Sequence, residues 1–231
     1  MIGFDPMYFY FVLPALILAG VASLMTSGTF NKYSRVRSAK GITGAEAAKR
    51  LLVSVGITDV RIEQTSGFLS DHYDPSSKVL RLSPKVYGES SLSAIGVACH
   101  EAGHALQHAQ GYIWLNMRSA MVPAVNISSM FSYIVLIGGF MLSSFNLIFV
   151  GIILFSASVL FSIITLPVEW NASSRAKVLM VQCGAVDRIE AQSAGAVLNA
   201  AFLTYVAAAI SSLLTLLYYL WRAGLIGGRR D

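Results

Sequence analysis

Long stretches without a charged residue dominate the chain. They run from Pro6 to Asn31, from Ser119 to Val168 and from Ala191 to Trp221. Because a helix needs about 20 apolar residues to cross a bilayer core, the first and third stretches each fit one crossing. The middle stretch fits two crossings, and the glycines and serines near its middle favour a turn. The pattern therefore predicts four transmembrane helices, at about 6–25, 122–141, 146–166 and 197–221.

The polar segment 26–121 shows helical and strand periodicity within one small domain. A capping-box pattern at Thr43–Glu46 begins an amphipathic helix that ends near Gly56. Short β-rich runs then predict an antiparallel sheet, followed by a helix that begins at Ser90 or Ser91 and is stopped by Gly111. The predicted strands are 60–64, 68–69 and 78–83, with a turn at 74–77, and the predicted second helix is 92–110.

The composition supports a membrane protein and indicates its orientation. Hydrophobic residues make up 55% of the chain and charged residues only 13%, whereas soluble domains carry about 25% charged residues. With four spans, the segments 26–121 and 167–196 lie on one side, and together they hold fourteen of the seventeen Lys and Arg residues. The positive-inside rule places this side in the cytoplasm. Basic flanks at anionic headgroups account for the net charge, so we expect a lipid bilayer partner and no nucleic acid.

The strongest chemical signal is an H-E-x-x-H motif at His100–His104 on the second predicted helix of the polar segment. Histidines four residues apart lie on one helical face and can reach one zinc ion. Glu101 beside them can take a proton from an activated water and pass it to a leaving amine. Chance placement of four His and six Glu gives roughly 0.002 occurrences of this motif in such a chain, so the motif predicts a zinc hydrolase.

A third zinc ligand has to come from elsewhere in the chain. His108 stands about 12 Å along the helix from His100, too far to share one tetrahedral ion. Glu169 directly follows the long apolar stretch, on the same predicted side of the membrane as the motif. An acid at the end of an apolar helix can equally mark the water boundary, and position alone leaves the two interpretations of Glu169 evenly balanced.

Two cysteines, Cys99 and Cys183, fall in the segments assigned to the cytoplasm. Disulfides are rare in that reducing compartment, so both are interpreted as free thiols. Cys99 adjoins His100, but neighbouring helix positions point about 100° apart. We therefore interpret Cys99 as a small buried hydrophobic residue rather than a metal ligand.

Four sequence blocks resemble the YugP family of bacterial membrane zinc metallopeptidases. They are Ser70–Pro75, Val97–Ala105, Leu166–Glu169 with Ala172–Ser173, and Val197–Ala207, and the likeness covers nearly the whole chain. The resemblance implies a mainly α membrane protein with a small α+β zincin-like catalytic domain of the gluzincin type. It also implies that Glu169 is the third zinc ligand beside His100 and His104.

Three further residues are candidates around this site. The family pattern has Asp where this chain has Asn171, and an acceptor there can orient a ligating histidine through its free ring N–H, less strongly with an amide. Arg175 either anchors Glu169 or a substrate carbonyl, or is a positive-inside flank. His72 precedes a strand at which a substrate can add as an extra strand, so it is a candidate for steadying a developing oxyanion, although its surroundings also favour a turn.

These observations predict a membrane zinc endopeptidase with a protein or peptide substrate. An intramembrane metalloprotease is a poorer match, because the apolar run around the motif is too short to span a bilayer. A non-catalytic membrane scaffold or partner-binding protein with a structural metal site is the alternative, but it leaves Glu101 without a role. Small residues in 197–221 are compatible with helix packing within the chain or in a homo-oligomer.

Overall fold

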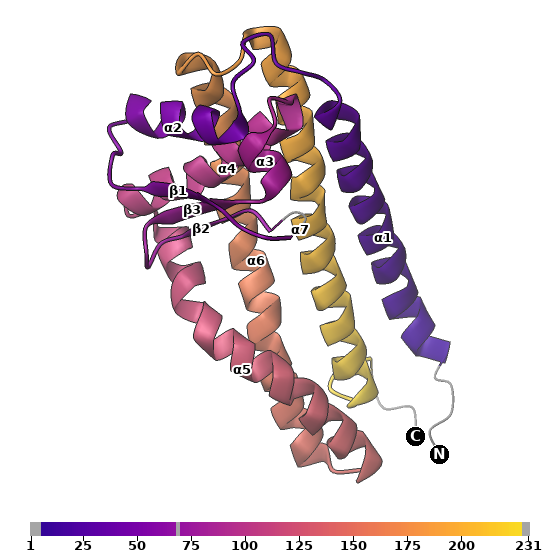
Figure 1. The fold of residues 1–231 in the computed structure, drawn as a ribbon. Helices are drawn as coiled ribbons and strands as arrows, with labels where there is room; N and C mark the ends of the chain where they lie inside the picture. The colour runs from indigo at the N-terminus through magenta and orange to yellow at the C-terminus, as the bar shows by residue number, and fades with distance from the viewer. Residues whose placement is uncertain (1–5, 68–69, 228–231) are drawn as a thin grey trace. The chain divides into compact units, whose positions relative to one another are not determined.

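The computed structural model describes residues 6–67 and 70–227 of a mainly helical protein that also contains a small sheet (Figure 1). The described residues form two compact units. We call these the apolar unit, within Met1–Ala22, Met117–Leu166 and Thr204–Asp231, and the sheet unit, within Ser23–Asn116 and Pro167–Leu203. Each unit is therefore assembled from segments far apart in the sequence.

Four helices are long and apolar enough to cross a membrane, as the sequence predicts. They are α1 (Pro6–Ser34), α5 (Ile113–Met141), α6 (Phe145–Gln182) and α7 (Arg188–Arg222). Each begins or ends well outside its predicted span, because hydropathy marks only the apolar part of a helix. The extension of α6 matters most, since it carries the helix past Pro167 and through the polar sequence that contains Glu169.

In the apolar unit, small residues allow close helix contacts. Leu136 of α5 packs in a buried cluster with Phe155 of α6. A side chain at Gly151 would place its Cβ 2.6 Å from Cγ of Leu136, so only glycine fits there. The Ser162 and Ser212 hydroxyls join α6 to α7 at 2.9 Å. Such contacts are typical of helix packing in membranes.

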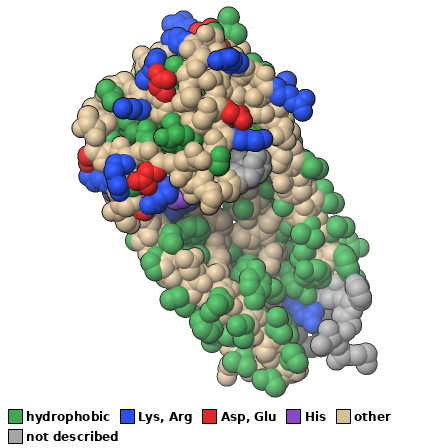
Figure 2. Space-filling model, in the orientation of Figure 1, with side chains coloured by type: hydrophobic (Ala, Val, Ile, Leu, Met, Phe, Trp, Pro, Cys, Tyr) green, Lys and Arg blue, Asp and Glu red, His purple; other side chains and the backbone are tan. Residues whose placement is uncertain are grey.

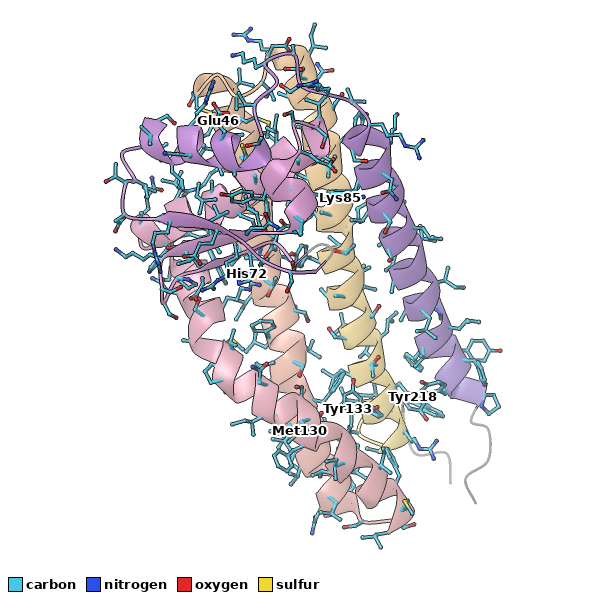
Figure 3. All side chains as sticks on the ribbon, viewed as in Figure 1. Glu46, His72, Lys85, Met130, Tyr133 and Tyr218 are labelled. Carbon is cyan, nitrogen blue, oxygen red and sulfur yellow. The ribbon has the colours of Figure 1, made fainter. Side chains whose placement is uncertain are left out.

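The surface composition of the two units differs. On the face shown in Figure 2, hydrophobic side chains cover the apolar unit, while most of the visible charged side chains gather over the sheet unit. Tyr133 and Tyr218 lie among the side chains of the apolar unit, and Glu46 and Lys85 lie on helices of the sheet unit (Figure 3). This distribution is the one expected for a chain whose apolar unit contacts lipid.

The sheet unit contains a three-stranded sheet of strand order β1-β3-β2. Its strands are β1 (Arg61–Gln64), β2 (His72–Asp74) and β3 (Val79–Leu82). The predicted antiparallel arrangement is wrong for one pairing, because β1 pairs with β3 in parallel and only β2 pairs with it antiparallel. A tight turn after Asp74 determines the direction of β2 relative to β3, whereas β1 is separated from its partner β3 in the sequence by β2. The predicted strand 68–69 lies outside the described residues.

Three shorter helices lie wholly within this unit: α2 (Gly44–Ser54), α3 (Pro84–Gly88) and α4 (Leu92–Ala109). The predicted caps of α2 and α4 are confirmed, since the Thr43 and Ser91 hydroxyls accept from the first-turn amides of Glu46 and Ala94. The short helix α3 was not predicted, because five residues show no clear periodicity. The central helix is α4, whose residues Ile95, Ala98, Cys99 and Ala102 are buried in the core.

Candidate metal centre

The two histidines of the motif lie one turn apart on α4. The ring centroids of His100 and His104 are 4.7 Å apart, with the rings nearly perpendicular. Both side chains are largely buried, with exposed fractions of 12% and 9%. The four-residue spacing therefore places two imidazoles beside one point, as the sequence predicts.

Glu169 reaches the same point from α6. Its Oε2 atom lies 3.2 Å from Nε2 of His100 and 3.6 Å from Nε2 of His104, and its side chain is 2% exposed. The three residues offer donor atoms that all lie within 4.8 Å of one another, a group that can hold a metal ion. Two imidazole nitrogens and one carboxylate oxygen are a typical donor set for catalytic zinc.

A close approach of backbones brings these ligands together. Gly103 of α4 lies between the two histidines, and a Cβ there would lie 2.8 Å from the carbonyl oxygen of Ala172 on α6. Gly96, two turns earlier, makes a similar close contact with Ala194 of α7. Because Gly103 lacks a side chain, α4 can pack directly against α6, the helix that carries Glu169.

The outer nitrogen of each imidazole has a polar partner. The Ser173 hydroxyl lies 3.1 Å from Nδ1 of His100, and Oε1 of Gln107 lies 3.0 Å from Nδ1 of His104. Both Nε2 atoms therefore face Glu169, while both Nδ1 atoms are held by hydrogen bonds. Ligating histidines in metal sites are usually held in this way.

Gln107 and Ser173 are not among the site residues predicted from the sequence. Asn171 is predicted to hold a ligating histidine, whereas the structure places Gln107 between Asn171 and His104, with Nε2 of Gln107 donating to Oδ1 of Asn171 over 3.0 Å. A signal for both residues exists in the spacing. Gln107 follows His104 by three positions and Ser173 follows Glu169 by four, so each lies on the same helical face as a ligand.

The electrostatics of the site favour a positive charge. Burial by itself lowers the pKa of His104, but the hydrogen bond and charge of the Glu169 carboxylate, with a further contribution from Glu101, outweigh burial and raise that pKa above its ordinary value. The buried carboxylate thus stabilises a cation beside His104. A metal ion held by these donors would satisfy the same preference.

Glu101 is the remaining residue of the motif, and it is largely buried on α4. It directly follows His100 and precedes His104 by three positions on this helix, so it lies close to the donor group. A carboxylate beside a metal centre can act as a general base when a water occupies the open position.

The other candidate residues lie elsewhere in the sheet unit. His72 is on the edge strand β2 (Figure 3), where its Nδ1 bonds the Ser70 carbonyl oxygen. The guanidinium of Arg175 donates to Gln110 and lies over the ring of Tyr112, 5.7 Å from its centroid. Arg175 is thus engaged at the C-terminal end of α4.

His108 also forms a hydrogen bond away from the donor group, since its Nδ1 lies 2.9 Å from the Tyr73 hydroxyl. Tyr73 belongs to β2, so this contact joins the end of α4 to the sheet. It leaves His108 in a structural contact rather than among the three donors that converge at Glu169.

These features describe a membrane protein with four membrane-capable helices and a buried group of two histidines and one glutamate that can hold a metal ion. The chain belongs to the family described as "Putative neutral zinc metallopeptidase", whose sequence profile matches residues 8–224. It is similar to the "Putative membrane protease YugP" of Bacillus subtilis (strain 168), with 48% identity over 213 residues, covering 92% of this chain and 95% of the relative. No solved structure matches the chain.

Proposed function

We propose that the protein is a membrane-bound zinc endopeptidase in which His100, His104 and Glu169 hold zinc and Glu101 is the general base. The observation that carries this proposal is the convergence of the three donor atoms within 4.8 Å on two packed helices. A motif of this type with a downstream glutamate ligand is the gluzincin arrangement. The family and the named relative support peptide hydrolysis as the reaction.

The proposed reaction is hydrolysis of a peptide bond. When bound, zinc supplies a Lewis acid that polarises the scissile carbonyl and lowers the pKa of a water molecule. Glu101 accepts a proton from the attacking water as the new C–O bond forms. Glu101 then donates this proton to the amide nitrogen as the C–N bond breaks, so the products are a carboxylic acid and an amine.

We propose that the substrates are membrane-associated or unfolded proteins, cleaved at the cytoplasmic face of the inner membrane. The edge position of β2 supports binding of an extended segment, because an edge strand offers unpaired backbone groups to an added strand. His72 on β2 would lie beside such a segment. The concentration of Lys and Arg in 26–121 and 167–196 supports the cytoplasmic face.

The number of ligands favours this proposal over a scaffold with a structural metal. Structural zinc sites almost always have four protein ligands, whereas catalytic sites have three and one open position. Among the described residues, the donor group of His100, His104 and Glu169 supplies three. A scaffold would also give the buried Glu101 no catalytic role, whereas peptide hydrolysis uses it as the general base.

The test is zinc content and proteolysis of the full chain, purified in detergent, for wild type and three variants. We expect about one zinc per wild-type chain, as three ligands to one ion require, and loss of zinc in His104→Ala and Glu169→Ala. Glu101→Gln is expected to keep its zinc and to lose roughly 10²–10⁴-fold in cleavage of an unfolded protein substrate.

Two results would contradict the proposal in different ways. Zinc retained in Glu169→Ala would remove Glu169 from the ligand set and assign it to the membrane boundary. Full activity in Glu101→Gln, or a wild-type chain that binds no zinc, would argue for the scaffold instead.

A further inference from the structure

Gln107 is a fully buried amide on α4, next to the metal centre, with hydrogen-bond partners for both ends of its side chain. Its Nε2 donates to the carbonyl oxygen of Val168 over 2.8 Å and to Oδ1 of Asn171 over 3.0 Å. Its Oε1 lies 3.0 Å from Nδ1 of His104. An unpaired amide would be costly to bury, so this set of contacts explains why a polar side chain is tolerated here.

The partners fix which way the amide faces. The Val168 carbonyl can only accept a hydrogen bond, so the NH₂ group of Gln107 has to face α6. Its oxygen then faces His104, and because an amide oxygen can only accept, Nδ1 of His104 has to carry the proton. The ring therefore presents the lone pair of Nε2 toward Oε2 of Glu169, which is the tautomer that a metal ligand requires.

The same amide connects the two helices that carry the ligands. Val168 and Asn171 lie one residue before and two residues after Glu169 on α6, while Gln107 and His104 lie on α4. One side chain thus fixes the orientation of a histidine ligand and holds the backbone that carries the carboxylate ligand. Unlike an aspartate, it does so without adding negative charge to the buried centre.

We infer that Gln107 is a positioning residue, which sets the tautomer of His104 and holds the α6 ligand segment in register with it. This inference rests on the proposed metal centre. Asn171 takes part indirectly, because its Oδ1 accepts one of the two amide hydrogens and so keeps the Gln107 side chain from turning over.

The experiment compares zinc affinity, measured by competition with a chromophoric chelator, for the full chain in detergent. Gln107→Met keeps the length of the side chain but removes its hydrogen bonds, and we expect zinc binding to weaken roughly 10–100-fold. Gln107→Glu keeps an acceptor for His104, and the Asn171 amide can turn to donate to the new carboxylate. We therefore expect this variant to bind zinc more tightly than Gln107→Met.

Gln110→Met is the matched control. Gln110 caps the same helix, but its side chain accepts a hydrogen bond from Arg175 and contacts no proposed ligand. The zinc affinity of Gln110→Met should therefore match that of wild type. The visible absorption of the cobalt-substituted protein is the second readout. A changed ligand geometry alters this spectrum in Gln107→Met, whereas a purely structural role would lower the unfolding temperature and leave the spectrum of the folded protein unchanged.

Asn171→Ala provides a second variant should Gln107→Met not fold. It leaves the Gln107 side chain in place and removes one of the two acceptors of its NH₂ group. We therefore expect a smaller loss of zinc affinity than in Gln107→Met. Two results would overturn the inference about Gln107 while leaving the proposed metal centre intact. One is wild-type zinc affinity and spectrum in both Gln107→Met and Asn171→Ala, and the other is equal zinc affinity of Gln107→Met and Gln107→Glu. A wild-type chain that binds no metal would overturn the proposed centre together with it.

Discussion

Cys99 immediately precedes the first histidine of the motif, yet it belongs to the core and not to the metal centre. Its side chain is fully buried in the cluster of apolar residues around α4, and both cysteines are free thiols, as the sequence predicts. Burial, with a smaller contribution from Cys183, raises the pKa of the Cys99 thiol far above its ordinary value. A thiol in this state is neither a nucleophile nor a metal ligand at neutral pH.

The two thiols should therefore differ sharply in reactivity. In the native protein at neutral pH we expect iodoacetamide to modify Cys183, which is partly exposed, and to leave Cys99 unmodified. Mass spectrometry of the labelled chain measures this, with unfolded protein as the reference in which both react. Cys183→Ala should take up almost no label until it is unfolded, and rapid labelling of that variant would show that the core around α4 opens readily.

The sequence predicted the residues of the donor group better than it predicted the residues that hold them in place. His100 and His104 are recognisable because their spacing is local and follows from helix geometry. Gln107 and Ser173 act through contacts with residues 61 and 73 positions away, so their roles depend on how α4 packs against α6. Their spacing places Gln107 and Ser173 on the same helical faces as donor residues, but it does not show which side chain each of them contacts.

At the level of elements, the contact between α4 and α6 determines the metal centre. Both histidines lie on α4 and the glutamate on α6, and at Gly103 the α4 backbone lies close to the backbone of Ala172 on α6. The sequence placed the motif on a helix, but it did not show that α6 continues past Pro167 to meet that helix. In the sheet, the turn after Asp74 was predicted, but the strand His72–Asp74 and the parallel pairing of β1 were not.

Gly103→Ala tests this contact. The added methyl group would lie 2.8 Å from a backbone oxygen that cannot rotate away, so α6 has to shift. We expect a loss of about 1–3 kcal/mol in stability and a weaker affinity for zinc, measured by thermal unfolding and chelator competition. Gly88→Ala, whose methyl group would meet nothing within 4 Å, is the control and should match wild type in both. Unchanged zinc affinity in Gly103→Ala would mean that the helices need not pack this closely.

At the level of the whole molecule, charge and hydropathy predict which side of the membrane the sheet unit occupies. Four spanning helices put 26–121 and 167–196 on one side, and these segments hold most of the Lys and Arg residues. The number of membrane-spanning helices can be predicted from the sequence, because long apolar stretches have few alternatives to a spanning helix. Orientation rests on the distribution of positive charge.

Cysteine labelling in intact bacterial cells tests the orientation. In a Cys183→Ala background, Lys85→Cys places a thiol on the exposed helix α3, and we expect a membrane-impermeant maleimide to reach it only after permeabilisation. Leu225→Cys, beyond the end of α7, should react without permeabilisation. The reverse pattern would place the metal centre on the outer face.

The position of Glu169 on α6 also limits how the protein can be divided. The segment before α5 contains the complete HExxH motif, yet the chain passes through residues 117–166 of the apolar unit before it returns to the sheet unit with the third donor. Cleavage anywhere in residues 117–166 would place the two histidines and Glu169 on different fragments of the chain. No fragment of continuous sequence therefore contains all three donor residues without the apolar segment 117–166 between them.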